Sequence, residues 1–129
     1  MMKQFNTAQE VCDYSVQKIV EQGKRCMDDG ICLYGDGQGN HCGIGWLLDP
    51  DNKELMNYNR GVQDVVDDFP NDVPEVIKDN IDLFYKLQRF HDQPNSIIRE
   101  IFRDGLRDNY KIDTSAPHWQ QWVDMGAEE

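Results

Sequence analysis

Two amphipathic segments separated by a proline place the strongest constraint on the fold of this chain. The first runs from about residue 72 to residue 90, where Ile77, Ile81, Phe84 and Leu87 recur at helical spacing. Asp72 and Pro74 are typical of its start. The second runs from about residue 96 to residue 107, and its predicted inward residues are Ile97, Ile98, Ile101, Phe102 and Leu106. Because residues 93–95 break the helix in a short connection, the sequence predicts an αα-hairpin.

Two further helices are predicted at the ends of the chain. Thr7 and Glu10 form a capping box, which predicts a helix over residues 7–28 with Gly23 as its weak point. Near the other end, Ser115 as cap and Pro117 in the first turn predict a helix over residues 115–125. Between them, residues 53–61 are expected to form a short helix followed by a loop, and residues 62–69 one or two turns of helix.

Two short apolar runs, residues 31–34 and 41–46, flank a loop rich in Gly and Asp. This pattern predicts a β-hairpin, in which Cys32 and Cys42 are cross-strand neighbours. Gly43 and Gly45 would leave a bare face for another backbone or for a ligand. A chain of 129 residues suggests a single domain, residues 1–129. The predicted fold class is α+β: a small antiparallel β-hairpin packed against three main helices, including the αα-hairpin.

The charge balance excludes some classes of partner. The 24 acidic residues outnumber the 13 basic ones, which gives a formal net charge of −11. Direct nucleic-acid binding is not expected, because phosphate recognition depends on Lys and Arg. No apolar run approaches the roughly 20 residues of a membrane span, and no signal peptide is recognisable. We therefore expect a cytosolic protein with reduced thiols.

Acidic residues are concentrated between residues 64 and 82, where seven acids accompany Lys78 alone. This acidic patch is one candidate binding site. It is either a solvated face that favours solubility or a negative surface for a basic partner. The residues assigned to it are Asp64, Asp67, Asp68, Asp72 and Glu75.

A second candidate site centres on Gln88 and His91. Both continue the helical phase of Ile81 and Phe84, so they are predicted to face inward. They either hold the αα-hairpin together by hydrogen bonds or form a pocket floor, with His91 oriented by Asp92 or Gln88. The candidate pocket comprises Tyr34, Gly43, Gly45, Gln88, His91 and Asp92.

Catalytic and metal-binding alternatives use the same residues. A Cys–His pair would combine His91 with Cys32 or Cys42 as nucleophile. A zinc site could draw on Cys32, Cys42, His41 and His91, but their spacing matches no recognised zinc motif. We therefore assign no catalytic residue, no metal ligand and no cofactor.

Several short motifs together resemble a family of small proteins common in tailed phages and prophages. They are Cys32-x-Tyr34, the Cys42–Asp49 segment, Asn59-Arg60-Gly61 and Leu87-Gln88-x-x-His91-Asp92. The resemblance spans about residues 28–108 and departs from the family pattern at Gly35 and Arg60. It implies a phage-encoded accessory protein acting in the bacterial cytoplasm.

Together these features lead us to expect a non-enzymatic binding protein that takes part in host takeover, for example as an inhibitor of an anti-phage defence system. Two mechanisms are open. The acidic surface would block a host protein with a basic surface, or the pocket would sequester a small nucleotide-like signalling molecule. The alternative is a small Cys/His-dependent enzyme.

Overall fold

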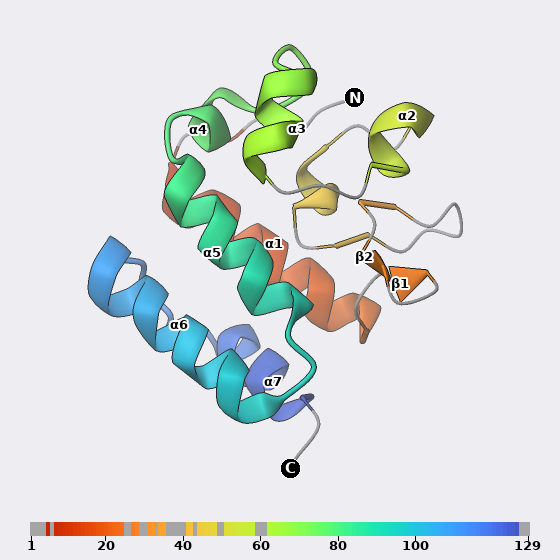
Figure 1. Ribbon diagram of the computed structural model, residues 1–129. Helices are drawn as coiled ribbons and strands as arrows, with labels where there is room; N and C mark the ends of the chain where they lie inside the picture. The colour runs from red at the N-terminus through yellow and green to blue at the C-terminus, as the bar shows by residue number, and fades with distance from the viewer. Residues whose placement is uncertain are drawn as a thin grey trace.

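The computed structural model describes residue 5 and residues 7–24, 27–28, 31–32, 34–35, 41–42, 44–48, 51–58 and 62–126. This part of the chain is mostly helical (Figure 1). Its α-helices are α1 (Ala8–Gln22), α2 (Lys53–Met56), α3 (Val62–Asp68), α4 (Glu75–Lys78), α5 (Ile81–Asp92), α6 (Ser96–Tyr110) and α7 (Pro117–Asp124). Strands β1 (Met27–Asp28) and β2 (Ile31–Cys32) and the 3-10 helix η1 (Gly45–Leu47) complete the elements.

The α+β prediction is wrong, because the segment expected as the second strand is not extended. Strand β2 pairs instead with β1 in an antiparallel ladder of two residues on each side. Residues 45–47 coil into η1, in which the Leu47 amide donates to the Ile44 carbonyl at 2.9 Å. Because this segment satisfies backbone groups within its own turns, it has no need of a partner strand.

Helix α1 begins as predicted but ends earlier. The Thr7 hydroxyl accepts a hydrogen bond from the Glu10 amide at 3.2 Å. At the other end, Gly23 adopts a left-handed conformation with φ +80° and donates its amide to the Ile19 carbonyl. The predicted extension to residue 28 is wrong, because this glycine terminates the helix and β1 follows.

The segment predicted as one helix over residues 72–90 is two helices. Helix α4 ends at Lys78, and the Asn80 side chain donates to the Val76 carbonyl at 2.8 Å. This bond satisfies a carbonyl at the end of α4, and α5 starts in a new direction at Ile81. The predicted cap at Asp72 is wrong, because α4 follows Pro74 with no side-chain cap. Likewise α7 follows Ala116, not Ser115.

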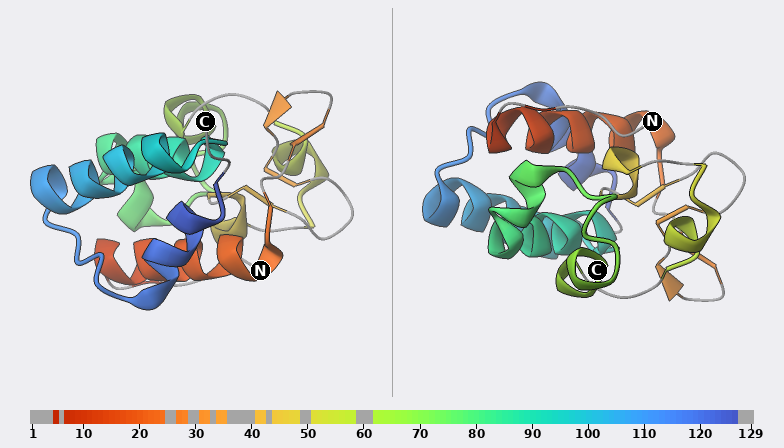
Figure 2. Two further views of the ribbon diagram at one scale, coloured as in Figure 1. Left: turned by 90° about the horizontal axis from the view of Figure 1, so that it is seen from below. Right: turned by 90° about the horizontal axis from the view of Figure 1, so that it is seen from above.

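Helices α5 and α6 lie side by side, joined by residues 93–95, as the proline break predicted (Figure 1). Helix α1 lies behind α5, and α7 lies against both α1 and α6 (Figure 2). Trp119 and Trp122 of α7 fill the space between these helices, both with no exposed surface. No described helix is both long and apolar enough to cross a membrane.

The predicted inward face of α6 is wrong for its three isoleucines. Ile97 is 61% exposed and Ile101 is 63% exposed, and Ile98 is exposed as well. Leu106 faces the core, as predicted, and Arg99 faces it as well. Helix α6 is therefore rotated so that an arginine is inside and an apolar ridge is outside.

Candidate functional site

His91 lies on α5 and points at α1, with no exposed surface, which confirms that it faces inward. Its Nδ1 atom is 2.6 Å from the Leu87 carbonyl oxygen, and its Nε2 atom is 3.2 Å from the Ser15 hydroxyl. Because a carbonyl oxygen only accepts, Nδ1 carries the proton and Nε2 accepts from Ser15. Both ring nitrogens of His91 are thus engaged within the protein.

The electrostatics of His91 agree with a neutral ring. Burial lowers its pKa from 6.5 to about 4, against the opposing effect of the hydrogen bonds at Leu87 and Ser15, and the charge of Arg99 lowers it further. At neutral pH the imidazole is uncharged, and its pKa lies well below the value best suited to a general base. The geometry therefore favours a structural role for His91.

Arg99 is a further buried polar residue, and the sequence reasoning missed it. Its Nε and Nη1 atoms donate to the carbonyls of Gln93 and Trp122, both at 2.6 Å. Its guanidinium carbon lies 3.8 Å from the centroid of the Trp122 ring. A signal for it was present, because Arg99 precedes the buried Leu106 by seven residues, or two helical turns. We call Ser15, His91 and Arg99 the buried polar cluster.

The structure brings three residues of the predicted pocket together. A Cβ placed on Gly45 would lie 2.0 Å from the Tyr34 carbonyl oxygen, so the two backbones are in direct contact. The Gln88 side chain accepts a hydrogen bond from the Ile44 amide at 3.2 Å. Tyr34 is buried, and that burial raises the pKa of its hydroxyl well above the ordinary value, with the charges of Cys42 and Asp92 adding to the shift. At Gly45 the bare face is therefore occupied by the protein itself.

Gly43 and Asp92 give little further evidence about the predicted pocket. Gly43 lies outside the described residues, and Asp92 is half-buried at the end of α5. His91 is on the same helix as Gln88, but its ring nitrogens face Leu87 and Ser15 rather than Ile44. The pocket remains a prediction, and the described residues place protein atoms where a ligand would sit.

Cys42 and His41, two of the groups needed for the Cys/His alternatives, have other partners. The Cys42 sulfur accepts from the Gly45 amide at 3.3 Å, and Nδ1 of His41 is 2.9 Å from the Tyr34 carbonyl oxygen. Burial raises the pKa of the Cys12 thiol far above its ordinary value, which keeps it protonated. The side chain of Cys32 lies outside the described part of the chain. Within that part, no three His, Cys, Asp or Glu side chains gather as metal ligands.

The acidic patch lies mainly on α3. Asp64, Asp67 and Asp68 are all exposed there. Asp67 accepts from Gln63, and Asp68 accepts from the Tyr58 hydroxyl. No lysine or arginine within the described residues forms an ion pair with these three carboxylates. They therefore present an exposed negative surface that no basic side chain of the described residues compensates.

The other two members of the acidic patch contribute less charge to solvent. Asp72 is half-buried between α3 and α4. Glu75 is exposed but forms an ion pair with Lys78 at 2.9 Å. The uncompensated part of the acidic patch is thus its α3 portion.

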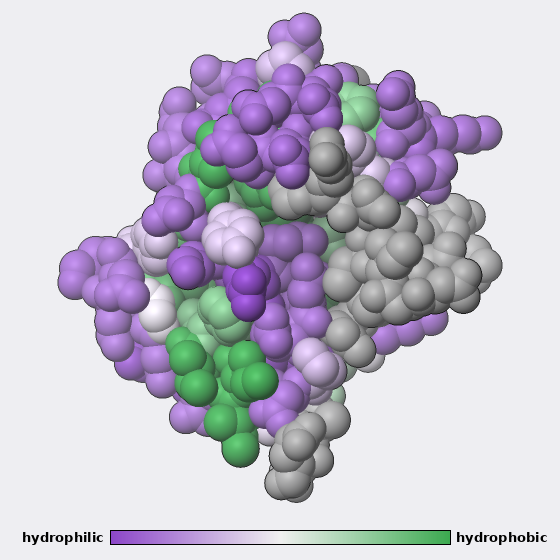
Figure 3. Space-filling model, viewed as in Figure 1, coloured by the Kyte–Doolittle hydropathy of each residue, from purple (hydrophilic) through white to green (hydrophobic). Residues whose placement is uncertain are grey.

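A surface that the sequence reasoning missed lies on the outer side of α6. Apolar surface gathers there over the first turns of the helix, facing the viewer in Figure 3. We call Ile97, Ile98 and Ile101 the isoleucine ridge. A groove of about 200 Å³ adjoins it between α5 and α6, lined by Lys86, Phe102 and Gly105, among others.

In comparisons with known proteins, no family model, no curated protein and no solved structure matches this chain.

Proposed function

We propose that this chain is a non-enzymatic binding protein that blocks a basic surface of a host protein. The observation that carries the proposal is the set of three exposed, uncompensated carboxylates on α3, in a protein of net charge −11. Opposite charge on a partner raises the rate of encounter and orients the two proteins. The resemblance to small phage proteins supports a phage accessory role, directed at a host process such as anti-phage defence.

The buried polar cluster supports this choice over an enzyme. His91 and Arg99 have their polar atoms engaged with backbone carbonyls and with Ser15, in places closed to a substrate. A catalytic base needs an accessible proton acceptor with a pKa near the working pH. Among the described residues, the exposed carboxylates are therefore better suited to binding a protein partner than the buried polar groups are to catalysis.

The test uses a matched pair of variants. Asp64→Asn, Asp67→Asn and Asp68→Asn together remove three charges from α3. Glu21→Gln, Glu54→Gln and Asp124→Gln remove three exposed charges elsewhere, so both proteins carry the same net charge. Proteins captured from bacterial lysate by the wild type are identified by mass spectrometry, and their association and dissociation rates are measured against all three forms.

We expect the α3 variant to associate about tenfold more slowly, with little change in dissociation, and the control variant to resemble the wild type. Raising the salt concentration should reduce the difference, because surface charges are screened within about 8 Å at physiological ionic strength. Equal association rates for the two variants would remove the α3 carboxylates from the proposal. Conversion of a metabolite by the purified protein would instead establish an enzyme, and retention of one would establish sequestration.

A further inference from the structure

The isoleucine ridge is unusual because large apolar side chains are exposed to solvent on a helix that also carries many polar residues. Ile97 and Ile101 are each more than 60% exposed. They occupy successive turns of α6, with Ile98 beside them, so they form one continuous surface (Figure 3). Extended apolar surface of this kind typically marks an interaction site.

The groove beside the ridge offers room for an apolar side chain of a partner. A Cβ placed on Gly105 would have only Asn109 within 4 Å, at 3.8 Å, so the helix backbone is open to close approach there. Phe102 and Lys86 line the same groove, from α6 and α5 respectively. A side chain of a second helix can therefore enter next to Gly105 while the ridge covers its flanks.

The two sides of the ridge differ in charge: basic side chains lie on one side and the exposed Glu100 on the other. On the α5 side lie Lys86 and Arg89, and no acidic side chain among the described residues forms an ion pair with either. The Arg89 guanidinium instead lies over the rings of Tyr85 and Phe102, at 5.8 and 5.3 Å. This is the basic rim of the ridge.

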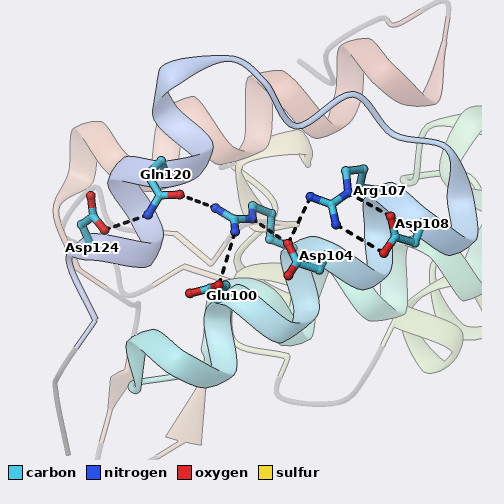
Figure 4. Close-up of polar contacts among 7 residues, drawn as sticks. Glu100, Asp104, Arg107, Asp108, Gln120 and Asp124 are labelled. Carbon is cyan, nitrogen blue, oxygen red and sulfur yellow. Dashed lines mark hydrogen bonds and ion pairs between the residues drawn. The ribbon is translucent and has the colours of Figure 1, made fainter.

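The acidic rim lies on the α7 side. Glu100 and Asp104 project from α6 there, and Asp104 forms ion pairs with both Arg103 and Arg107, at 3.1 and 3.4 Å (Figure 4). Arg103 also donates to Gln120 of α7. Glu100 is 56% exposed, and its nearest contact with Arg103 is 3.9 Å. Glu100 is therefore the carboxylate of this acidic rim that is accessible to a further cation.

We propose that a second copy of this chain covers the isoleucine ridge in a two-fold dimer. The two-fold axis lies in the interface and is parallel to α6. Rotation about that axis sets the two ridges against each other with their α6 helices parallel. It also places the acidic rim of each copy opposite the basic rim of the other, so that Glu100 of one copy faces Arg89 of the other. Two-fold dimers are the commonest protein oligomers, and they require a self-complementary surface such as this one.

This dimer is independent of the proposed function, because α3 is not part of the interface. It would nevertheless affect binding, since two acidic patches in one particle allow bivalent engagement of a partner with repeated basic sites. The dimer also explains why Lys86 and Arg89 are kept on a protein with such a large negative charge.

Sedimentation equilibrium of the wild type tests the proposal, at physiological ionic strength and from low micromolar to near-millimolar protein. We expect a reversible dimer. Ile101→Asp should be monomeric over this range, with the melting temperature of the monomer preserved because the side chain is exposed. Asn71→Asp adds the same charge at an exposed turn between α3 and α4, and it should dimerise like the wild type.

A charge exchange tests the orientation of the two copies. Arg89→Glu should weaken the dimer about tenfold, because it places like charges across the interface. Adding Glu100→Arg to the same chain should restore affinity to within about threefold of the wild type, since both Glu100–Arg89 pairs are then reversed.

Three results would overturn the proposal. They are a wild type that is monomeric at all concentrations, a dimer that survives Ile101→Asp, and an Arg89→Glu dimer that Glu100→Arg does not restore. Unfolding of Ile101→Asp would also contradict it, because it would place Ile101 in the core of the monomer.

Discussion

The buried polar cluster and the isoleucine ridge lie on neighbouring parts of the same helical layer and are opposite in character. In the cluster, Ser15, His91 and Arg99 are withdrawn from water, and the hydrogen-bonding atoms described above meet protein partners. On the ridge, Ile97 and Ile101 stand in water without cover from the described residues. The buried polar cluster therefore maintains the fold, since buried polar groups stabilise a protein only when they are hydrogen-bonded. The isoleucine ridge is the part that is available for association.

The largest effect should come from removing the arginine of the cluster. Arg99→Ala deletes two charge-assisted hydrogen bonds and leaves the carbonyls of Gln93 and Trp122 without these donors. We expect the free energy of unfolding to fall by roughly 3–5 kcal/mol. Urea denaturation measures the loss. Arg99→Lys is the control: it keeps the charge but not the two-pronged donor geometry, so it should recover only part of that energy.

An Arg99→Ala variant that loses less than about 1 kcal/mol would contradict the structural role of the cluster. The guanidinium would then contribute no more than an ordinary surface side chain, and the reversed rotation of α6 would need another cause.

The pH dependence of stability should reveal His91. Its pKa is about 4 in the folded protein and 6.5 in an ordinary environment. Between these values the unfolded chain binds a proton that the folded chain does not, so stability is fully present above about pH 6.5 and falls as the pH is lowered toward 4. The loss attributable to His91 is roughly 3 kcal/mol.

His91→Gln provides the comparison, since an amide can hydrogen-bond with Ser15 but does not titrate. The difference between the two unfolding curves should open between pH 6.5 and pH 4 and remain constant above that window. Carboxylates and the other histidines are common to both proteins and cancel in the difference. Parallel curves across the window would show that His91 titrates normally and is accessible to solvent.

Particular residues show how far the sequence could lead. The Thr7 cap and the break at Pro94 were predictable, because they depend on short-range chemistry that each segment carries by itself. The 3-10 helix at residues 45–47, where a strand was expected, was not predictable, because local turns and the contact of Gly45 with Tyr34 are favoured over extension. The rotation of α6 was not predicted either: three isoleucines outweigh one arginine in any hydropathy pattern, and only the carbonyls of Gln93 and Trp122 bring Arg99 inward.

The candidate functional residues likewise include some that the sequence could predict and some that it could not. The burial of His91 followed from its helical phase with Ile81 and Phe84 and is confirmed. Its partner Ser15 is 76 residues away in the sequence, and no local pattern connects the two. The isoleucine ridge escaped notice because an apolar stripe on a helix is normally assigned to the core.

The measurement that tests this account most directly compares two apolar residues of α6. Leu106→Ala and Ile101→Ala are unfolded in urea at a protein concentration where both are monomeric. Leu106 has no exposed surface and Ile101 is 63% exposed. We predict that Leu106→Ala loses about 2–5 kcal/mol and that Ile101→Ala changes by less than about 0.5 kcal/mol. Equal losses for the two variants would show that the isoleucines are part of the core, and would contradict both the orientation of α6 and the surface built on it.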